Sequence, residues 1–176
     1  MKKLRRMMAI LLTVCCVCVF AAAPTFAASN QTKTQNYDVL RSDNVIKALN
    51  CYGRDSFRIT YNGNKVIACT ATQTKSDLGS GLYEKGGIKC TKKTSGKWTY
   101  QSVWKLNLRL MPKSMVPLAK KYAPALVALQ KVGTILKVTT TYEVNANGTL
   151  KKVKTSLQWF TTLASYKNAV AKWFRF

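Results

Sequence analysis

The 176-residue chain contains no histidine and only six acidic residues. Without an imidazole, it cannot build a Ser-His-Asp triad, a Cys-His dyad or a histidine-containing zinc site. None of the six carboxylates belongs to a recognisable catalytic motif. Neither Gly79–Gly81 nor Gly86–Gly87 is followed by Gly-Lys-Ser/Thr, so these stretches do not predict a phosphate-binding loop. We therefore expect a protein that is not an enzyme and that holds no cofactor or metal.

Cysteine is scarce after the N-terminal region, because three of the six cysteines lie within residues 1–27. The other three, Cys51, Cys69 and Cys90, contain no Cys-x-x-Cys pair, which argues against a redox or metal-binding motif. An exported protein can form disulfides. Cys69 with Cys90 is the favoured pair because both lie in or beside predicted strands, and Cys51 would then stay free. Three reduced and partly buried thiols are the alternative.

Residues 1–27 have the pattern of a secretory signal peptide. Four basic residues within the first six positions precede an uncharged apolar run over 7–23, and small residues surround the expected cleavage after Ala27. An uncleaved membrane anchor is the alternative, since the run approaches the length of the shortest spanning helices. A lipoprotein signal is less favoured, because Val14 is large for the position before a modified Cys15. We expect a secreted, extracellular or envelope-associated protein of bacterial origin.

The charge of the chain is strongly unbalanced. Removal of residues 1–27 takes away four basic residues and no acidic ones, which leaves a formal charge of +19, and lysine supplies 20 of the remaining 25 basic residues. Such a charge attracts polyanions and anionic membrane surfaces, and this attraction weakens as salt rises. Because lysine is a hydrated point charge and not a bidentate fork, the excess indicates diffuse attraction more than recognition of one defined group.

The segment 97–111 has the clearest structural pattern. From Trp98 to Leu110 every second residue except Ser102 is aromatic or leucine, and polar residues mostly fill the positions between them. Alternation of this kind predicts a strand with one face in the core. We expect the other elements to cover or extend this strand.

The remaining elements are predicted from shorter patterns. Residues 28–36 are small and polar, which predicts a disordered leader, and 37–50 has the spacing of an amphipathic helix. The other predicted elements are a hairpin of 57–61 and 66–72, a short strand at 88–92 after a Gly-rich loop, a helix over 114–133 that is kinked or divided at Pro124, a second hairpin of 136–144 and 150–160, and a C-terminal helix over 165–176.

These elements predict a single basic domain of the α+β class over residues 37–176. Its expected architecture is a curved antiparallel sheet of about six strands, a meander plus a hairpin, packed against helices as a roll or half-barrel. Several unrelated proteins share such arrangements, so the fold by itself would not decide the function.

Six basic residues are predicted to point outward from the strands and to form a candidate anion-binding face: Arg58, Lys105, Arg109, Lys137, Lys152 and Lys154. A merely solvated surface is the alternative. In the C-terminal helix, Trp173 and Phe174 lie on an apolar stripe that basic residues flank. This stripe fits either a membrane interface or one side of the core.

The sequence as a whole favours a non-enzymatic, secreted and strongly basic protein that associates with anionic envelope or extracellular polymers or surfaces. Two alternatives stay open. The first is a cationic antimicrobial or toxin-like protein that acts on membranes, and the second is a carrier that holds an apolar ligand between sheet and helix. No specific protein partner and no oligomeric state follow from the sequence.

Overall fold

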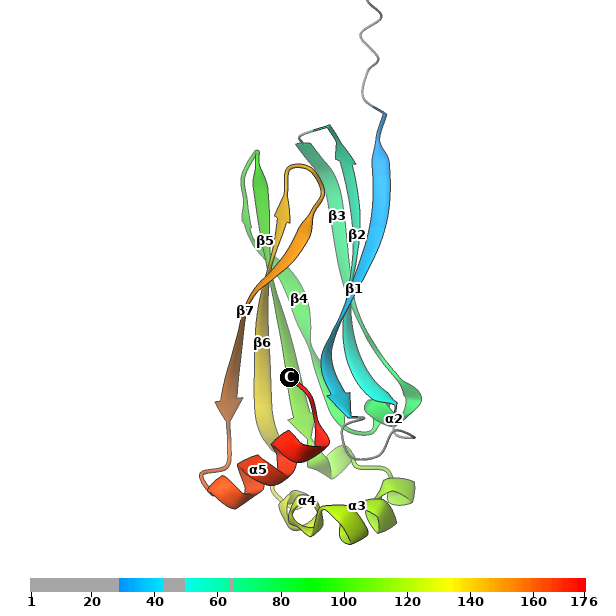
Figure 1. Ribbon diagram of the computed structural model, residues 1–176, viewed down its shortest axis with the longest axis vertical. Coiled ribbons are helices and arrows are strands. Elements are labelled where there is room, and N and C mark those ends of the chain that lie inside the picture. Colours follow the sequence, from blue (N-terminus) through cyan, green and yellow to red (C-terminus); the bar gives the residue numbers. More distant parts are fainter. Residues whose placement is uncertain (1–28, 43–49, 64) are drawn as a thin grey trace, which may run out of the picture.

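The computed structural model describes residues 29–42, 50–63 and 65–176 (Figure 1). These residues form seven strands in two antiparallel sheets together with four α-helices, so the α+β class is confirmed. The strands are divided between sheets of three and four, neither of which is closed, in place of one sheet of about six. The predicted signal peptide lies outside the described residues.

Sheet A has the strand order β1-β2-β3. Its members are β1 (Gln31–Ser42), β2 (Cys51–Asn62) and β3 (Lys65–Lys75), and both pairs are antiparallel. The predicted hairpin between β2 and β3 is confirmed, with a turn in which Gly63 has a φ of +54°. Such a backbone angle favours glycine, which explains why the turn falls at this residue.

Strand β1 covers residues for which the sequence predicts a disordered leader and the start of a helix. Residues 31–36 instead pair with Tyr61 to Ser56 of β2, and 37–42 continue the same strand. The helix prediction is therefore wrong over 37–42 and at Asn50, which is in no helix, while residues 43–49 lie outside the described part. The first half of β1 is mostly exposed and polar. It belongs to the sheet through backbone pairing, which leaves no apolar pattern in the sequence.

Sheet B has the order β4-β5-β6-β7, with β4 (Tyr83–Lys93), β5 (Lys97–Asn107), β6 (Thr134–Asn145) and β7 (Leu150–Trp159). The alternation predicted for 97–111 is confirmed as far as Leu106, and its inward residues are buried. The strand ends earlier than expected, because the Asn107 side chain accepts a hydrogen bond from the Arg109 backbone N–H at 3.1 Å and begins a 3-10 turn over Leu108–Leu110.

The two sheets pack face to face, and aromatic rings fill the space between them. Phe57 of β2 lies 4.8 Å from Tyr142 of β6 and 5.6 Å from Tyr100 of β5, measured between ring centroids. Tyr37 of β1 lies 5.3 Å from Tyr142. Ring pairs at these distances and tilts stabilise a core beyond the effect of area burial. The central strands β5 and β6 are therefore held with one face against sheet A and the other toward solvent.

Four α-helices lie in the described residues: α2 (Asp77–Ser80) connects the sheets, and α3 (Val116–Tyr122), α4 (Pro124–Leu129) and α5 (Ala164–Trp173) gather at one end of them (Figure 1). The division of the predicted 114–133 helix at Pro124 is confirmed. Beyond α5, the backbones of Arg175 and Arg41 form an isolated antiparallel bridge, so the C-terminal tail is attached to β1. In the described part of the chain, no helix has the length and apolar character needed to cross a membrane.

Trp173 and Phe174 are only 3% and 2% exposed. The Phe174 ring makes an edge contact with Tyr83 of β4, with 6.1 Å between centroids. Trp173 and Phe174 therefore belong to the core. The interpretation of these two side chains as membrane-interface residues is corrected.

Candidate anion-binding face

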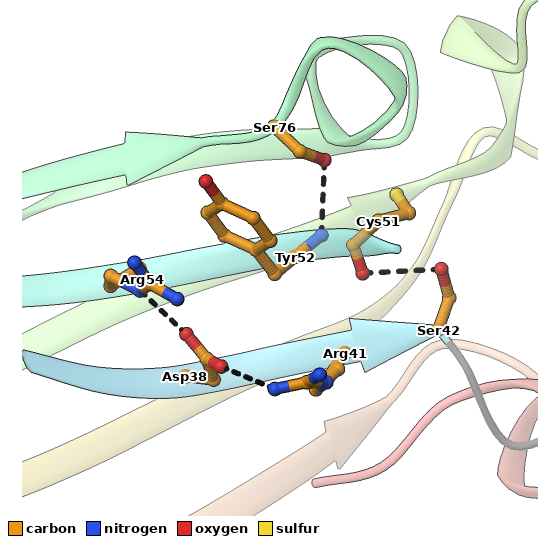
Figure 2. A network of polar contacts seen from close by, with 7 residues as sticks. All are labelled: Asp38, Arg41, Ser42, Cys51, Tyr52, Arg54 and Ser76. Carbon is orange, nitrogen blue, oxygen red and sulfur yellow. Dashed lines mark hydrogen bonds and ion pairs between the residues drawn. The ribbon is translucent and has the colours of Figure 1, made fainter. Parts of the chain in front are cut away.

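Outward residues of sheet A are mainly hydroxylated side chains. Among its basic residues, Arg41 and Arg54 both bind Asp38, whose carboxylate accepts hydrogen bonds from Arg54 Nε at 2.7 Å and from Arg41 Nη1 at 3.0 Å (Figure 2). The Arg54 guanidinium also lies 4.4 Å from the centre of the Tyr52 ring. Asp38 raises the pKa of Arg54, mainly through the hydrogen bond. Two of the arginines on this face are thus engaged with an acid of the same sheet.

The outward face of sheet B is different, and we call it face B. Strand register places on it a set of seven lysines and two glutamates: Lys89, Lys92, Lys97, Lys105, Lys137, Lys151, Lys154, Glu84 and Glu143. Lys97 pairs with Glu143 at 3.0 Å and Lys105 with Glu84 at 3.7 Å. Within the described ranges, no carboxylate lies within ion-pair distance of the other five lysines. Face B therefore carries a clear excess of positive charge.

The lysines of face B are arranged across all four strands. Lys105 and Lys137 stand directly opposite each other on β5 and β6. One complete row runs from Lys89 through Gln101 and Thr141 to Lys154. Like charges directly opposite each other destabilise a sheet. The Glu84 carboxylate, 3.7 Å from Lys105 Nζ, partly offsets this repulsion.

A hollow of about 310 Å³ lies on face B, lined by Gly86, Gly87, Ile88, Lys89, Gln101, Val103 and Lys137. It follows from a break in the register of β4 between Lys85 and Ile88. At Gly86 a Cβ atom would lie 2.7 Å from Val103 Cγ1, and Gly87 has a φ of +90°, so the bulge needs glycine at both positions. The Gly86–Gly87 pair therefore shapes a depression between two lysines.

A larger hollow of about 760 Å³ lies beside the turns that join β2 to β3 and β4 to β5, and it is lined by Asn62, Lys65, Val66, Ile67, Lys93, Thr94, Ser95 and Trp98. Lys93 Nζ lies 3.9 Å from the centre of the Trp98 ring, a cation–π contact. Because Trp98 is only 7% exposed, its ring is a core residue covered by Lys93 and offers little surface for stacking.

The structure brings together three of the six residues predicted for the anion-binding face: Lys105, Lys137 and Lys154. Arg58 is exposed on the opposite side of the molecule, on sheet A. Lys152 has the inward phase, because Tyr142 pairs with Lys152 while Thr141 pairs with Lys154, which makes Val153 a bulge. Arg109 lies in the 3-10 turn, where Nε and Nη2 donate to the Lys131 carbonyl at 3.1 and 3.0 Å.

The six residues predicted for the face did not include Lys89, Lys97 and Lys151, and the sequence indicated Lys92 only as a residue that could enlarge the face. A signal was present for Lys89, since it alternates with Ile88 and Cys90 within the short strand predicted at 88–92. The pattern is interrupted on both sides, because the register of β4 shifts between Lys85 and Ile88 and again between Cys90 and Lys92. These two bulges hid the full length of β4.

Within the described residues, the acidic side chains do not converge on one cleft. Asp38 binds two arginines, Glu84 pairs with Lys105 and accepts a hydrogen bond from Asn107, and Glu143 pairs with Lys97. In the portion of the chain that is described, no three Cys, Asp or Glu residues are grouped so that they could hold a metal ion. The largest group of like charges that shares a surface in these described residues is the set of lysines on face B.

Asp55 is fully buried between the two sheets. Its two carboxylate oxygens accept hydrogen bonds from Trp104 Nε1 and from the Tyr142 hydroxyl, each at 2.8 Å. Burial raises the pKa of Asp55, and the hydrogen bonds from these neighbours only partly counter this effect. Burial also raises the pKa of Tyr142, and the nearby Asp55 charge raises it further. The sequence contained a signal for this site, because Asp55 shares the phase of Phe57 and Ile59.

The raised pKa of Asp55 predicts a pH-dependent loss of stability. Below the pKa of about 3.9 expected in the unfolded chain, the carboxyl is neutral in both states. In that range its ionisation does not lower the free energy of unfolding. As pH rises from there through the higher pKa of the folded state, the unfolded state ionises first and the free energy of unfolding decreases. Asp55→Asn should remove this decrease, since an amide keeps an acceptor for Trp104 and the Tyr142 hydroxyl can accept from its NH₂. Urea unfolding of both proteins between about pH 3 and pH 8 measures this decrease. A difference in the free energy of unfolding between wild type and variant that does not change with pH would contradict the prediction.

Comparison of the chain with protein-family models, with curated proteins and with solved structures gave no match.

Proposed function

We propose that the protein is a secreted, non-enzymatic basic protein that associates with anionic polymers of the cell envelope or the extracellular space through face B. The observation that carries this proposal is the concentration of seven lysines on one sheet face, five of them with no carboxylate of the described residues in ion-pair distance. Export rests on the pattern of residues 1–27, as the sequence predicts.

The shape of face B suits an extended ligand better than a small anion. Four strands spaced about 4.8 Å apart give a surface of roughly 15 to 20 Å across the strands. The lysines are distributed over this width with Thr and Gln between them, as in the row Lys89, Gln101, Thr141 and Lys154. A polymer that crosses the strands can contact several ammonium groups at once, and the hollow beside Lys89 and Lys137 can admit one of its charged groups.

The two alternatives receive less support. The membrane-active alternative relied on Trp173 and Phe174, and both side chains are buried against the rest of the core. The carrier alternative needs room for an apolar ligand inside the fold. Between sheet B and the helices, buried side chains such as Leu106, Leu126 and Val170 belong to one packed core cluster.

Removal of four face B lysines should weaken binding to a polyanion and reduce its salt dependence. The variant carries Lys89, Lys137, Lys151 and Lys154 as glutamine, and the probe is a DNA duplex of about 20 base pairs, a polyanion of known charge spacing. Because each lysine–phosphate contact contributes about 0.9 to the slope of log Kobs against log salt, the slope should become shallower by about 3 to 4. Fluorescence anisotropy over about 0.05 to 0.3 M salt measures this slope.

The matched control replaces four exposed lysines at the helical end, Lys113, Lys120, Lys121 and Lys131, with glutamine. This variant loses the same net charge but keeps face B, so its slope should change by less than about 1. Equal changes in the two variants would mean that net charge alone attracts the polymer, and face B would then have no special part in binding.

A further inference from the structure

Cys69 and Cys90 lie on facing strands at one side of the sandwich. Cys69 on β3 pairs with Ile59, and Cys90 on β4 pairs with Tyr100. Directly opposite residues of a sheet share a face. Because Ile59 and Tyr100 are buried between the sheets, both cysteines take inward positions. Strands β3 and β4 are each the edge strand of their sheet and contact each other, so the two cysteines lie on the same side of the sandwich.

The Tyr100 side chain connects the two cysteine positions. It stands directly opposite Cys90 within sheet B, and its hydroxyl donates a hydrogen bond to the Cys69 carbonyl in sheet A at 3.0 Å. Burial raises the pKa of Tyr100, and both cysteines raise it further, which places both beside the same phenol. Burial likewise raises the pKa of Cys69, and Cys90 adds to that effect. One tyrosine therefore lies beside both residues.

We propose that Cys69 and Cys90 are a redox pair that forms a reversible disulfide joining β3 to β4 across this side of the sandwich. Both residues are free thiols in the structure, which is the reduced state of the pair. The third cysteine, Cys51, is fully buried in a different part of the core, where its carbonyl accepts a hydrogen bond from the Ser42 hydroxyl (Figure 2). It takes no part in the bridge and serves as an internal control.

The bridge forms by exchange with a small disulfide such as oxidised glutathione. Cys90 is exposed and reacts first: its thiolate attacks one sulfur of the small disulfide, forms a mixed disulfide and releases one thiolate. Cys69 is half-buried with a raised pKa, so it reacts second and displaces the other thiolate from Cys90. The two protons of the protein thiols end on the two released glutathione thiols, and the two electrons lost by the protein reduce the small disulfide.

The disulfide has a mechanical consequence for face B. It would attach β4, which carries Lys89 and Lys92, to sheet A through a covalent bond in addition to the connection through α2. Closing a loop of this length restricts the unfolded chain and is expected to raise Tm by roughly 6 to 12 °C for a domain of this size. Oxidation would thus stabilise the edge of the sheet that carries the hollow.

Tryptic mapping of the purified protein after equilibration with oxidised glutathione tests the proposal. Cleavage after Lys65, Lys75, Lys89 and Lys92 should yield peptide 66–75 joined to peptide 90–92, and both the bridge and the rise in Tm should disappear on reduction. Cys51→Ser should form the same bridge and show the same rise in Tm on oxidation as the wild type. Cys69→Ser should carry glutathione on Cys90 with no comparable rise in Tm.

Two results would overturn the proposal. One is a wild-type protein that keeps glutathione on Cys90 while Cys69 stays a free thiol, which would show that the sulfurs cannot meet in the folded protein. The other is a bridge that contains Cys51, which would require the packing around that buried residue to be different.

Discussion

Replacement of Trp104 by alanine is expected to lower the free energy of unfolding by about 3 to 5 kcal/mol, the usual cost of removing a large aromatic side chain from a core. Trp104 is fully buried, its ring lies edge-on to Tyr83 at 6.4 Å, and a Cβ atom at Gly53 would lie only 3.1 Å from it. Its Nε1 is also one of the two hydrogen-bond donors to the buried Asp55 carboxylate. The substitution therefore leaves a cavity and removes a partner from a buried acid.

Urea unfolding followed by circular dichroism measures this loss. Trp159→Ala is the matched control, because Trp159 is half-buried on the edge strand β7 and makes its ring contact with the exposed Phe176. A half-buried aromatic of this kind should cost less than about 2 kcal/mol. If the two alanine variants lose equal stability, the packing of β5 against sheet A is not the centre of the fold.

Phe174→Ala is expected to cost about 3 to 4 kcal/mol, because this side chain is 2% exposed and packs on Tyr83 beside the backbone bridge of Arg175 to β1. Phe176, two residues further along, is 37% exposed, so Phe176→Ala should cost less than about 1 kcal/mol. Thermal or urea unfolding of both variants gives the comparison. An unchanged stability in Phe174→Ala would contradict the core role of the tail and would return the membrane-interface interpretation to consideration.

The strands with buried alternation were predictable from the sequence. β5 was the clearest, because its inward residues from Trp98 to Leu106 are large and apolar apart from Ser102. The two hairpins were also predictable, since Gly63 and Gly148 mark their turns with positive φ angles of 54° and 73°. In each case a local pattern of side chains coincides with the structural constraint.

The division into two sheets could not be predicted, because alternation shows which side of a strand is buried but not which strands share hydrogen bonds. The separation occurs at α2, where the Ser76 hydroxyl accepts hydrogen bonds from the Gly79 N–H at 3.0 Å and from the Tyr52 N–H at 3.1 Å. These contacts turn the chain between β3 and β4, so that the meander does not continue within one sheet. A sequence pattern of five residues, SDLGS, is too short to indicate such a break.

The candidate site was predictable in kind but only partly in its residues. The excess of lysine and the outward phase of Lys105 and Lys137 were visible in the sequence. Which of the outward residues share one surface depends on sheet membership, and this separates Arg58 from the others. The bulge at Val153 changes the face on which Lys152 lies. Leu150 is out of phase with Val153 and Leu157, which indicates a bulge near Lys151 but not its exact position.

The most direct test of face B as the binding surface is a map of backbone amide chemical shifts during titration with a DNA duplex at low salt. The account predicts the largest changes at face B positions such as Gln101, Val103, Thr139 and Thr141, with little change at Thr60, Thr70 and Thr72 on the outer side of sheet A. Changes spread equally over the two outer faces, or concentrated on sheet A, would contradict it.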